Sequence, residues 1–337
     1  MGKARMVDVA KEAGVSLKTV SNYLNGYQFM SEQTVAKVRA AVELLHYVPN
    51  RSAQTLRTGK IGIIGLAVPN LRAPYFAELA SMITDAAQEH GYTVLIDQTG
   101  ADLKREQLAI AGVGPQALDG LIIAPLRLSA KNVSDATSTM PIVVLGEWAR
   151  PRSVPYVGVR NVEAARAATE HLLQLGRRRI AAVGRVSGSS GGTWDYRIRG
   201  YGQALDAAGI RQLKQYQPMI KNFLRDQGAR AAERLLALSH PPDALFCFSD
   251  MLAIGAMSVL HRQGVAIPDE IAVMGWDDID EAAYCWPPLT TVRARTDLVA
   301  RTAVEYLLLQ IKGETIASKA AFVDYDIVVR QSTIGRT

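Results

Sequence analysis

The chain has 337 residues, of which 48% are hydrophobic and 21% are charged. This length is enough for more than one domain, because single hydrophobic cores rarely grow beyond about 250–300 residues. The composition is that of a globular protein, and no apolar run approaches the roughly 20 residues of a membrane-spanning helix. The N-terminus has no apolar segment typical of a signal peptide, so we expect a cytoplasmic protein without membrane contact. Cys247 and Cys285 are expected to be reduced, with one disulfide as the alternative.

The positive charge is concentrated at the start of the chain. Residues 1–60 contain nine Lys or Arg and four Asp or Glu, a net charge of +5, whereas the rest of the chain has a net charge of +1. A basic segment of this kind favours a polyanion such as DNA as its partner. Taken alone, the charge is equally compatible with the solvated surface of an ordinary small domain.

Residues 1–46 predict three short helices. Apolar residues at helical spacing over Met6–Ala13 indicate a first helix that ends at Gly14. Ser16 is a favourable N-cap for a second helix, which Asn25-Gly26 closes, and a third helix begins at Ser31. Two short helices joined by a tight turn and braced by a third are typical of a helix-turn-helix.

Pro49 interrupts the helical pattern, and residues 47–60 form a short, polar, basic segment. One or two helical turns could form there, but an isolated helix of this length needs a partner to become ordered. We therefore interpret residues 47–60 as a hinge.

From residue 61 onward, short apolar runs alternate with amphipathic helices, which predicts βαβ units and parallel sheets. The alternation falls into two series, followed by a last helix through Val299–Leu307 and an apolar run over Ala320–Val329. We expect an α/β core at 61–337 with helices on both faces of its sheets. The first lobe is predicted at about 61–160 plus 293–320, and the second lobe at about 161–290 plus 321–337.

Residues 7–26 read VDVAKEAGVSLKTVSNYLNG and resemble the head of the LacI/GalR family of bacterial transcription regulators. The resemblance extends over the whole chain, because further segments match family landmarks in family order. These segments are Tyr47–Arg51, Ala67–Asn70, Pro74–Phe76, Asp119–Ile122, Arg197 with Gly200-Tyr201, Ser249-Asp250, Gly275–Ile279 and Pro288–Val292. The resemblance implies a helix-turn-helix head on a two-lobed sensor of the periplasmic-binding-protein type.

The second helix of the head is the predicted recognition helix. Leu17, Lys18, Ser21 and Asn22 lie on one exposed side of it, opposite the apolar residues of the same helix. Lysine can donate to guanine, leucine can touch a thymine methyl group, and asparagine can bind adenine. Ser16 and Thr19 are candidates for phosphate contacts near the helix N-terminus. The alternative is that these residues are ordinary surface polar groups.

Asn22 departs from a common family pattern, because many members have Arg at that position. The resemblance implies that the operator half-site differs at the corresponding base pair. In the hinge, Leu56 matches the leucine that each subunit of the family inserts into the minor groove, where apolar wedges kink the duplex. Ala53 and Gln54 are expected near the same groove, and the alternative for Leu56 is a cap on the sensor core.

The sensor is expected to hold a polar ligand between its lobes. Arg197, Ser249 and Asp277 are candidate hydrogen-bonding groups, with aromatic walls from Phe76, Trp148 and Phe223. Such a set suits the hydroxyls and the apolar ring face of a sugar. Arg197 and Asp277 match family effector positions, although each could instead form a structural ion pair. Ser249 stands where Asn is frequent in the family, and we expect Asp250 to cap the helix that follows.

Enzyme chemistry is not indicated. The glycine-rich segment at 184–192 lacks the spacing of a phosphate loop or dinucleotide fingerprint, and the five histidines have no metal-ligand spacing. We therefore expect no catalytic residue, no metal and no cofactor.

The sequence predicts a DNA-binding regulator, most simply a repressor, that acts as a homodimer or possibly a tetramer on a near-palindromic operator. The expected effector is a sugar or nucleoside. The alternatives are a purine-responsive corepressor-type regulator and, from other classes, a solute-binding protein or a sugar-handling enzyme of similar two-lobed fold. Whether the effector is an inducer or a corepressor stays open.

Overall fold

The computed structural model describes residues 4–24, 27, 29–47, 60–112, 117–136, 140–146, 154–186 and 192–335. The chain divides into two compact units, Met1–Ile61 and Gly62–Thr337. Residues 48–59, which make up most of the predicted hinge, lie outside the described residues. Within the described ranges, no helix combines the length and the apolar character needed to cross a bilayer.

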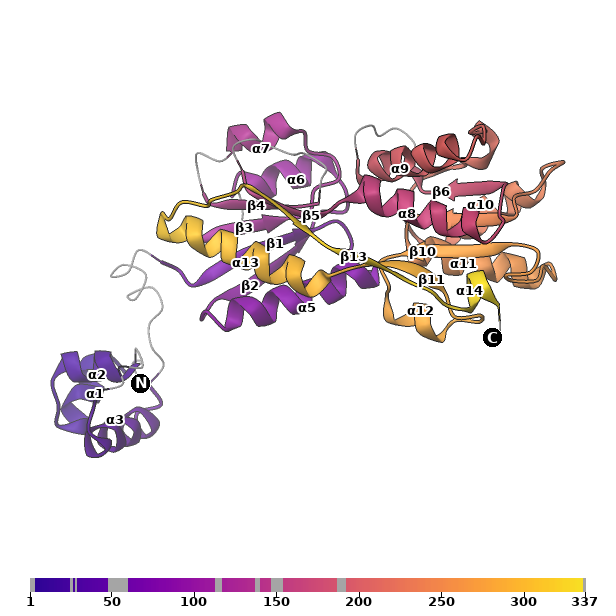
Figure 1. Cartoon of the computed structure of the whole chain (residues 1–337). Coiled ribbons are helices and arrows are strands. Elements are labelled where there is room, and N and C mark those ends of the chain that lie inside the picture. Colours follow the sequence, from indigo (N-terminus) through magenta and orange to yellow (C-terminus); the bar gives the residue numbers. More distant parts are fainter. Residues whose placement is uncertain are drawn as a thin grey trace. The chain divides into compact units, whose positions relative to one another are not determined.

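The N-terminal unit consists of α1 (Met6–Ala13), α2 (Leu17–Leu24) and α3 (Glu32–Leu44) (Figure 1). Gly14 adopts a left-handed conformation, with φ 64°, and ends α1 as predicted. The Ser16 hydroxyl accepts the backbone N–H of Thr19 at 3.1 Å, so Ser16 acts as the predicted N-cap. The Ser31 hydroxyl accepts the backbone N–H of Thr34, so Ser31 is the N-cap of α3, which begins one residue later than predicted. The small core contains Val9, Ala10, Ala13, Val20, Val38, Ala41 and Tyr47.

The larger unit contains two main sheets. The first is entirely parallel, with strand order β12-β5-β4-β3-β1-β2. Its strands are β1 (Ile63–Val68), β2 (Thr93–Gln98), β3 (Gly120–Ile123), β4 (Ile142–Leu145), β5 (Tyr156–Val159) and β12 (Ala320–Val323). The helices beside it are α5 (Pro74–Gln88), α6 (Leu103–Ile110), α7 (Ala130–Ala136) and α13 (Thr296–Lys312). Figure 1 shows α5 and α13 on one face of this sheet and α6 and α7 on the other. Central strands covered on both faces are almost wholly apolar, as in β3 and β4.

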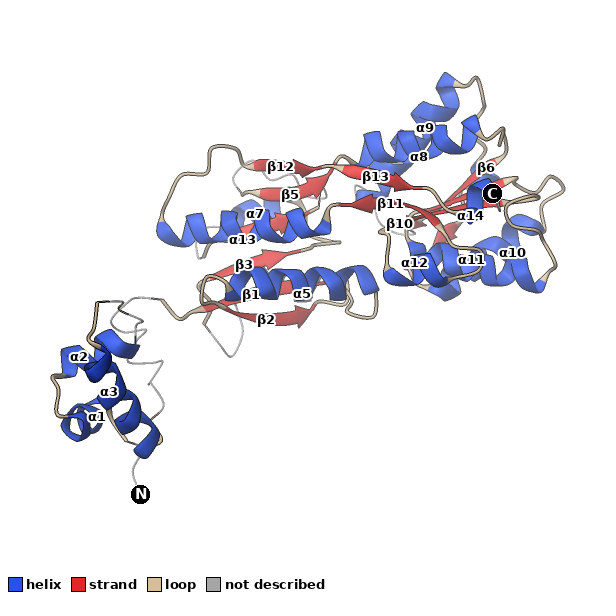
Figure 2. Ribbon diagram, turned by 60° about the horizontal axis from the view of Figure 1, so that its bottom comes forward, coloured by secondary structure: helices blue, strands red, loops and turns tan. Residues whose placement is uncertain are grey.

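The second main sheet has the order β13-β11-β10-β9-β6, and only β13 runs antiparallel to its neighbour. Its strands are β6 (Ile180–Val183), β9 (Ala244–Cys247), β10 (Ala272–Trp276), β11 (Thr290–Ala294) and β13 (Tyr325–Val328). Two helix pairs accompany it, α8 (Asn161–Gln174) with α9 (Thr193–Ala207) and α10 (Arg225–Leu236) with α11 (Asp250–Arg262) (Figure 2). The smaller elements are β7 (Arg185–Val186), η1 (Lys214–Tyr216), β8 (Met219–Ile220), α12 (Asp280–Tyr284) and α14 (Gln331–Ile334).

The predicted fold class is confirmed, but the expected limits of the lobes are wrong by a few residues. The apolar run Ala320–Val329 is two strands, because β12 pairs with β5 in the first sheet and β13 pairs with β11 in the second. β11 itself belongs to the second sheet up to Ala294, whereas the first lobe was expected to resume at 293. The chain stays extended as it passes between sheets, so no turn residue marks the crossing in the sequence.

Candidate ligand pocket and nucleic-acid interface

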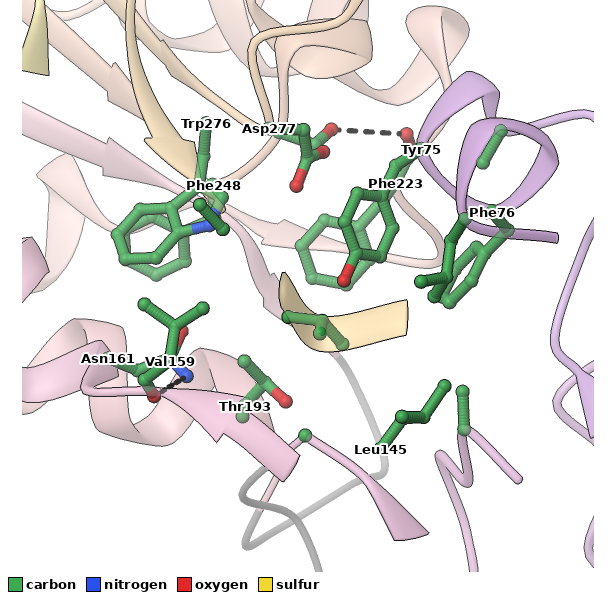
Figure 3. Close-up of a pocket in the computed structure, with 18 of the residues that line it drawn as sticks. Tyr75, Phe76, Leu145, Val159, Asn161, Thr193, Phe223, Phe248, Trp276 and Asp277 are labelled. Atoms are coloured by element: carbon green, nitrogen blue, oxygen red, sulfur yellow. Dashed lines mark hydrogen bonds between the residues drawn. The ribbon is translucent and has the colours of Figure 1, made fainter. Parts of the chain in front are cut away.

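A cavity of about 170 Å³ lies between the two main sheets of the core. Its walls come from the segments that follow the carboxyl ends of β3, β4 and β5 on one side and of β9 and β10 on the other. The carboxyl edge of parallel strands is where open α/β sheets place their ligands. Figure 3 shows aromatic side chains above the cavity and Val159, Asn161 and Thr193 below it.

Five of the six predicted effector residues line this one cavity. They are Phe76, Arg197, Phe223, Ser249 and Asp277, which come from both lobes of the core. The sixth, Trp148, lies outside the described residues, as do Ala53, Gln54 and Leu56 of the predicted hinge. The tertiary structure therefore brings together groups that are up to about 200 residues apart in the chain.

Arg197 is held in position on three sides. Its Nε donates to Asn161 Oδ1 at 2.9 Å, and its Nη1 donates to the carbonyl oxygen of Phe248. The guanidinium also lies over the Trp276 ring, 3.8 Å from the ring centroid, in a cation–π arrangement. These contacts bring α8, α9 and the ends of β9 and β10 to one donor group, and they preorganise that donor at the wall of the cavity.

Asp277 follows β10 in a strained turn. Its φ is 116° and that of Asp278 is 55°, both in a region that favours glycine. Asp278 is paired with Arg330 at 2.8 Å, which helps to hold the turn. Burial raises the pKa of Asp277 to about 7, while the guanidinium of Arg197 opposes this rise and the carboxylate of Glu78 adds to it. Asp277 therefore changes charge near neutral pH and can accept or donate a hydrogen bond to a ligand.

The predicted roles of Ser249 and Asp250 are partly reversed. The Ser249 hydroxyl accepts the backbone N–H of Leu252 at 3.2 Å and is the N-cap of α11, although the residue does line the cavity. Asp250 does not cap the helix, because its carboxylate bonds to Thr291 and to the backbone of Ile279. A serine followed by an aspartate offers two capping residues, and the sequence alone does not decide between them.

Several cavity residues were not predicted from the sequence. These are Tyr75, Asn161, Thr193, Trp194, Phe248 and Trp276. Most of them lie directly after a strand or in the first turn of the next helix, so their position at the carboxyl ends of predicted strands was an available signal. The indole Nε1 of Trp194 is buried and has no hydrogen-bond partner among the described residues.

In the N-terminal unit, the predicted DNA-reading residues share α2 and the turn before it. Leu17 is 51% exposed, Lys18 is also exposed, and Ser21 and Asn22 are half-buried. Val20 is fully buried and faces the small core. Ser16 and Thr19 share a hydrogen bond of 2.8 Å between their hydroxyls. The first turn of α2 thus presents an apolar and a cationic side chain to solvent, as the sequence predicted.

A three-helix head with this second helix, attached to a two-lobed ligand-binding core, defines a DNA-binding regulator that senses a small molecule. Residues 5–50 match the bacterial regulatory proteins of the lacI family, and residues 61–325 match the periplasmic binding proteins and sugar binding domain of the LacI family. The chain belongs to the LacI family and is a DNA-binding transcription regulator with a small-molecule effector domain.

Individual relatives agree with this assignment. The chain is 32% identical to the HTH-type transcriptional repressor CytR of Escherichia coli K12, over 98% of this chain and 96% of that protein. The structure of a lac repressor dimer bound to operator is similar with a TM-score of 0.85 and 25% identity, covering 98% of this chain and 99% of that one. A LacI family regulator from Lactobacillus casei with bound sucrose has a TM-score of 0.72 and 28% identity, covering 80% and 99%.

Proposed function

We propose that this chain is a cytoplasmic, homodimeric repressor whose operator affinity is set by a sugar or nucleoside bound between the lobes. The observation that carries the proposal is the distribution of groups in the cavity. Most of its lining is apolar or aromatic, and Arg197, Asn161 and Asp277 supply polar groups. A ring compound with one apolar face and a few hydroxyls matches this division.

Arg197 and Asp277 are the proposed anchors for ligand hydroxyls. The guanidinium only donates hydrogen bonds, whereas the Asp277 carboxylate accepts them when it is ionised. A hydroxyl can accept from the first and donate to the second, so vicinal diols of a sugar or of a ribose suit the pair. Phe76 and Phe223 are the proposed faces for the apolar side of the ring.

Of the two proposed ligand classes, sugar and nucleoside, the relative with bound sucrose supports the sugar. A purine is the alternative, because the aromatic walls would stack on its flat ring equally well. A purine lacks the vicinal hydroxyls, so it would bind through ring nitrogen atoms instead. Affinity for a free base and not for its nucleoside would favour the purine.

For the DNA, we propose that Leu17, Lys18, Ser21 and Asn22 read base edges while Ser16 and Thr19 contact phosphates. The exposure of Leu17 and Lys18 beside the buried Val20 supports this side of α2 as the reading surface. We also propose that Ala53, Gln54 and Leu56 contact the minor groove, on the ground of the family resemblance. A single head buries too little surface for tight, specific binding, and two heads on a dimer double it.

The first lobe offers a surface on which a second copy can pack. β2 is the outermost strand of its sheet, and its Leu95 and Ile96 are exposed. Met82 on the neighbouring α5 is exposed, and so is Leu71, which precedes that helix. Exposed apolar side chains on an edge strand are a liability for a monomer, so these residues support the proposed homodimer.

A combined binding experiment tests the proposal. The full chain is screened by thermal shift against sugars, sugar phosphates, nucleosides and purines, and then by gel shift on the DNA upstream of its own gene. We expect one sugar or nucleoside to raise the melting temperature and to change the affinity for that DNA. Phe223→Ala serves as the variant that loses the response to this compound and keeps operator binding. Specific DNA binding in no ligand state would overturn the assignment, and stabilisation by purines alone would replace the sugar with a purine.

A further inference from the structure

The second lobe contains another cavity, of about 270 Å³, which is separate from the effector pocket. It is lined by residues at the amino end of β6, by α9 and the segment after it, and by His240 before β9. The effector pocket lies at the carboxyl ends of the strands, so the two cavities are at opposite edges of the same sheet.

The interior of this second cavity is apolar. Ile180, Tyr201, Leu205 and Tyr216 line it, and each of them is no more than 5% exposed. The hydroxyl of Tyr201 donates to the carbonyl oxygen of Ile180 at 2.8 Å, and that of Tyr216 donates to the carbonyl oxygen of His240 at 2.8 Å. Because both hydroxyls are already bonded to the backbone, the tyrosines contribute ring surface to the interior.

Three arginines, Arg178, Arg179 and Arg211, surround this interior, and all three are exposed residues. No Asp or Glu is among the described residues that line the cavity. Arg179 is engaged, because it donates to the carbonyl oxygen of Pro241 at 2.9 Å and lies 3.7 Å from Asp243. The guanidinium groups of Arg178 and Arg211 make no ion pair or hydrogen bond with any described residue.

This cavity therefore combines an apolar interior with two guanidinium groups, those of Arg178 and Arg211, that have no carboxylate partner among the described residues, while Asp243 beside the cavity is engaged by Arg179 and by the backbone N–H groups of Arg178 and Arg179. Guanidinium forks bind phosphate and carboxylate oxygens with two parallel hydrogen bonds, and aromatic surface accepts a flat ring. We propose that it is a second ligand site, for a small ring compound that bears an oxyanion, either a phosphomonoester or a carboxylate. Arg178 and Arg211 bind the oxyanion, and the ring inserts against Tyr201, Leu205 and Tyr216.

The test uses the full chain and four probes in isothermal titration calorimetry. Phenyl phosphate and benzoate carry the ring and one of the two anions, phenol carries only the ring, and inorganic phosphate carries only the anion. Arg211→Gln and Arg178→Gln each remove one unpaired cation. Arg230→Gln on α10 is the matched control, because it removes an exposed arginine that does not line the cavity. All three changes are at the surface, and melting temperatures verify that the variants fold.

We expect phenyl phosphate or benzoate to bind at least tenfold more tightly than phenol or inorganic phosphate, and the stronger of the two identifies the anion. Arg211→Gln and Arg178→Gln should each weaken that binding by about 10- to 100-fold, the usual effect of losing a charged hydrogen bond. Arg230→Gln should leave it within twofold. Binding that is absent, that is equal in all three variants, or that is lost in Phe223→Ala instead would overturn the proposal. The last outcome would place the probe in the effector pocket.

Discussion

The carboxylate of Asp250 accepts a 2.7 Å hydrogen bond from the hydroxyl of Thr291, and both residues are fully buried. The other carboxylate oxygen accepts the backbone N–H of Ile279 at 3.0 Å. These two bonds tie the start of α11 to β11 and to the turn that contains Asp277. A side chain at Gly275 would collide with the same carboxylate, so the backbone of β10 also packs directly against it. The strained turn at the pocket is thus supported by a buried group that never contacts the pocket itself.

Asp250→Ala should lower the free energy of unfolding of the core by about 2–4 kcal/mol, because two buried donors lose their acceptor. Thr291→Val is the control and should cost about 1–2 kcal/mol, since it removes the hydroxyl that donates to Asp250 and accepts the backbone N–H of Asp278 at 3.3 Å but leaves the bond from Ile279 to Asp250 in place. Tryptophan fluorescence in urea measures the core selectively, because all four tryptophans follow residue 61. Equal losses in the two variants would contradict the proposed support of the turn.

The pKa of Asp277, raised from 3.8 to about 7, makes the stability of the core depend on pH. The folded state holds this proton more tightly than the unfolded chain does. Ionisation of Asp277 therefore destabilises the fold progressively as pH rises from about 4 through 7. The side chain of Asp277→Asn cannot ionise. The free energy of unfolding of this variant should therefore increase relative to that of the wild type as pH rises over this range, by at most about 4 kcal/mol.

Urea titrations of both proteins at several pH values between 4 and 8 measure this difference. Asp85→Asn, which removes an exposed carboxylate on α5, is the matched control for the loss of an aspartate. A difference between Asp277→Asn and the wild type that stays constant over this pH range would contradict the raised pKa of Asp277.

Asn22→Ala should relax base preference at one position of each operator half-site, at a cost of about 1–3 kcal/mol. The reason is that only a bidentate side chain on α2 distinguishes adenine from the other bases at that position. Gel shifts with all four base pairs at every half-site position measure the change. Lys37→Ala, at an exposed position on α3, is the control, and any effect it has should be uniform across sequences. An unchanged preference at every position for Asn22→Ala would rule out a reading role.

Helices α10 and α11 pack closely at two glycines, Gly228 of α10 and Gly255 of α11, and each glycine faces the backbone of the other helix. A side chain at Gly228 would collide with the carbonyl oxygen of Leu252, and one at Gly255 with that of Arg225. Gly255→Ala should therefore destabilise the core by about 1–3 kcal/mol, because the helices must move apart. Gly202→Ala in α9 meets only the exposed side chain of Gln212 and should be neutral or slightly stabilising. Thermal melts that rank the two variants in the opposite order would show that the crossing is loosely packed.

The sequence alone determined the local elements with strong chemical signals. Helix caps require a particular backbone conformation or a side-chain acceptor, and residues within the same turn meet these requirements. The ends of the head helices are therefore marked in the sequence, by Gly14, Ser16 and Ser31. The alternation of apolar runs and amphipathic helices likewise predicted parallel sheets. A strand buried on both faces is a continuous apolar run, whereas a helix buried on one face has apolar residues at helical spacing. The family landmarks then indicated Arg197 and Asp277 as partners in one pocket.

Only the tertiary structure decided what depends on contacts between distant segments. The passage of the chain from β12 to β13 changes sheets at Asp324, and no local signal marks it because the backbone remains extended. That Ser249, and not Asp250, caps α11 depends on Thr291 and Ile279, which only the fold brings to the Asp250 carboxylate. The raised pKa of Asp277 comes from burial between lobes, and burial is a property of the packed molecule. The helix limits of the head could therefore be predicted from neighbouring residues in the sequence. The hydrogen bonds and the raised pKa at the pocket could be found only from the folded structure.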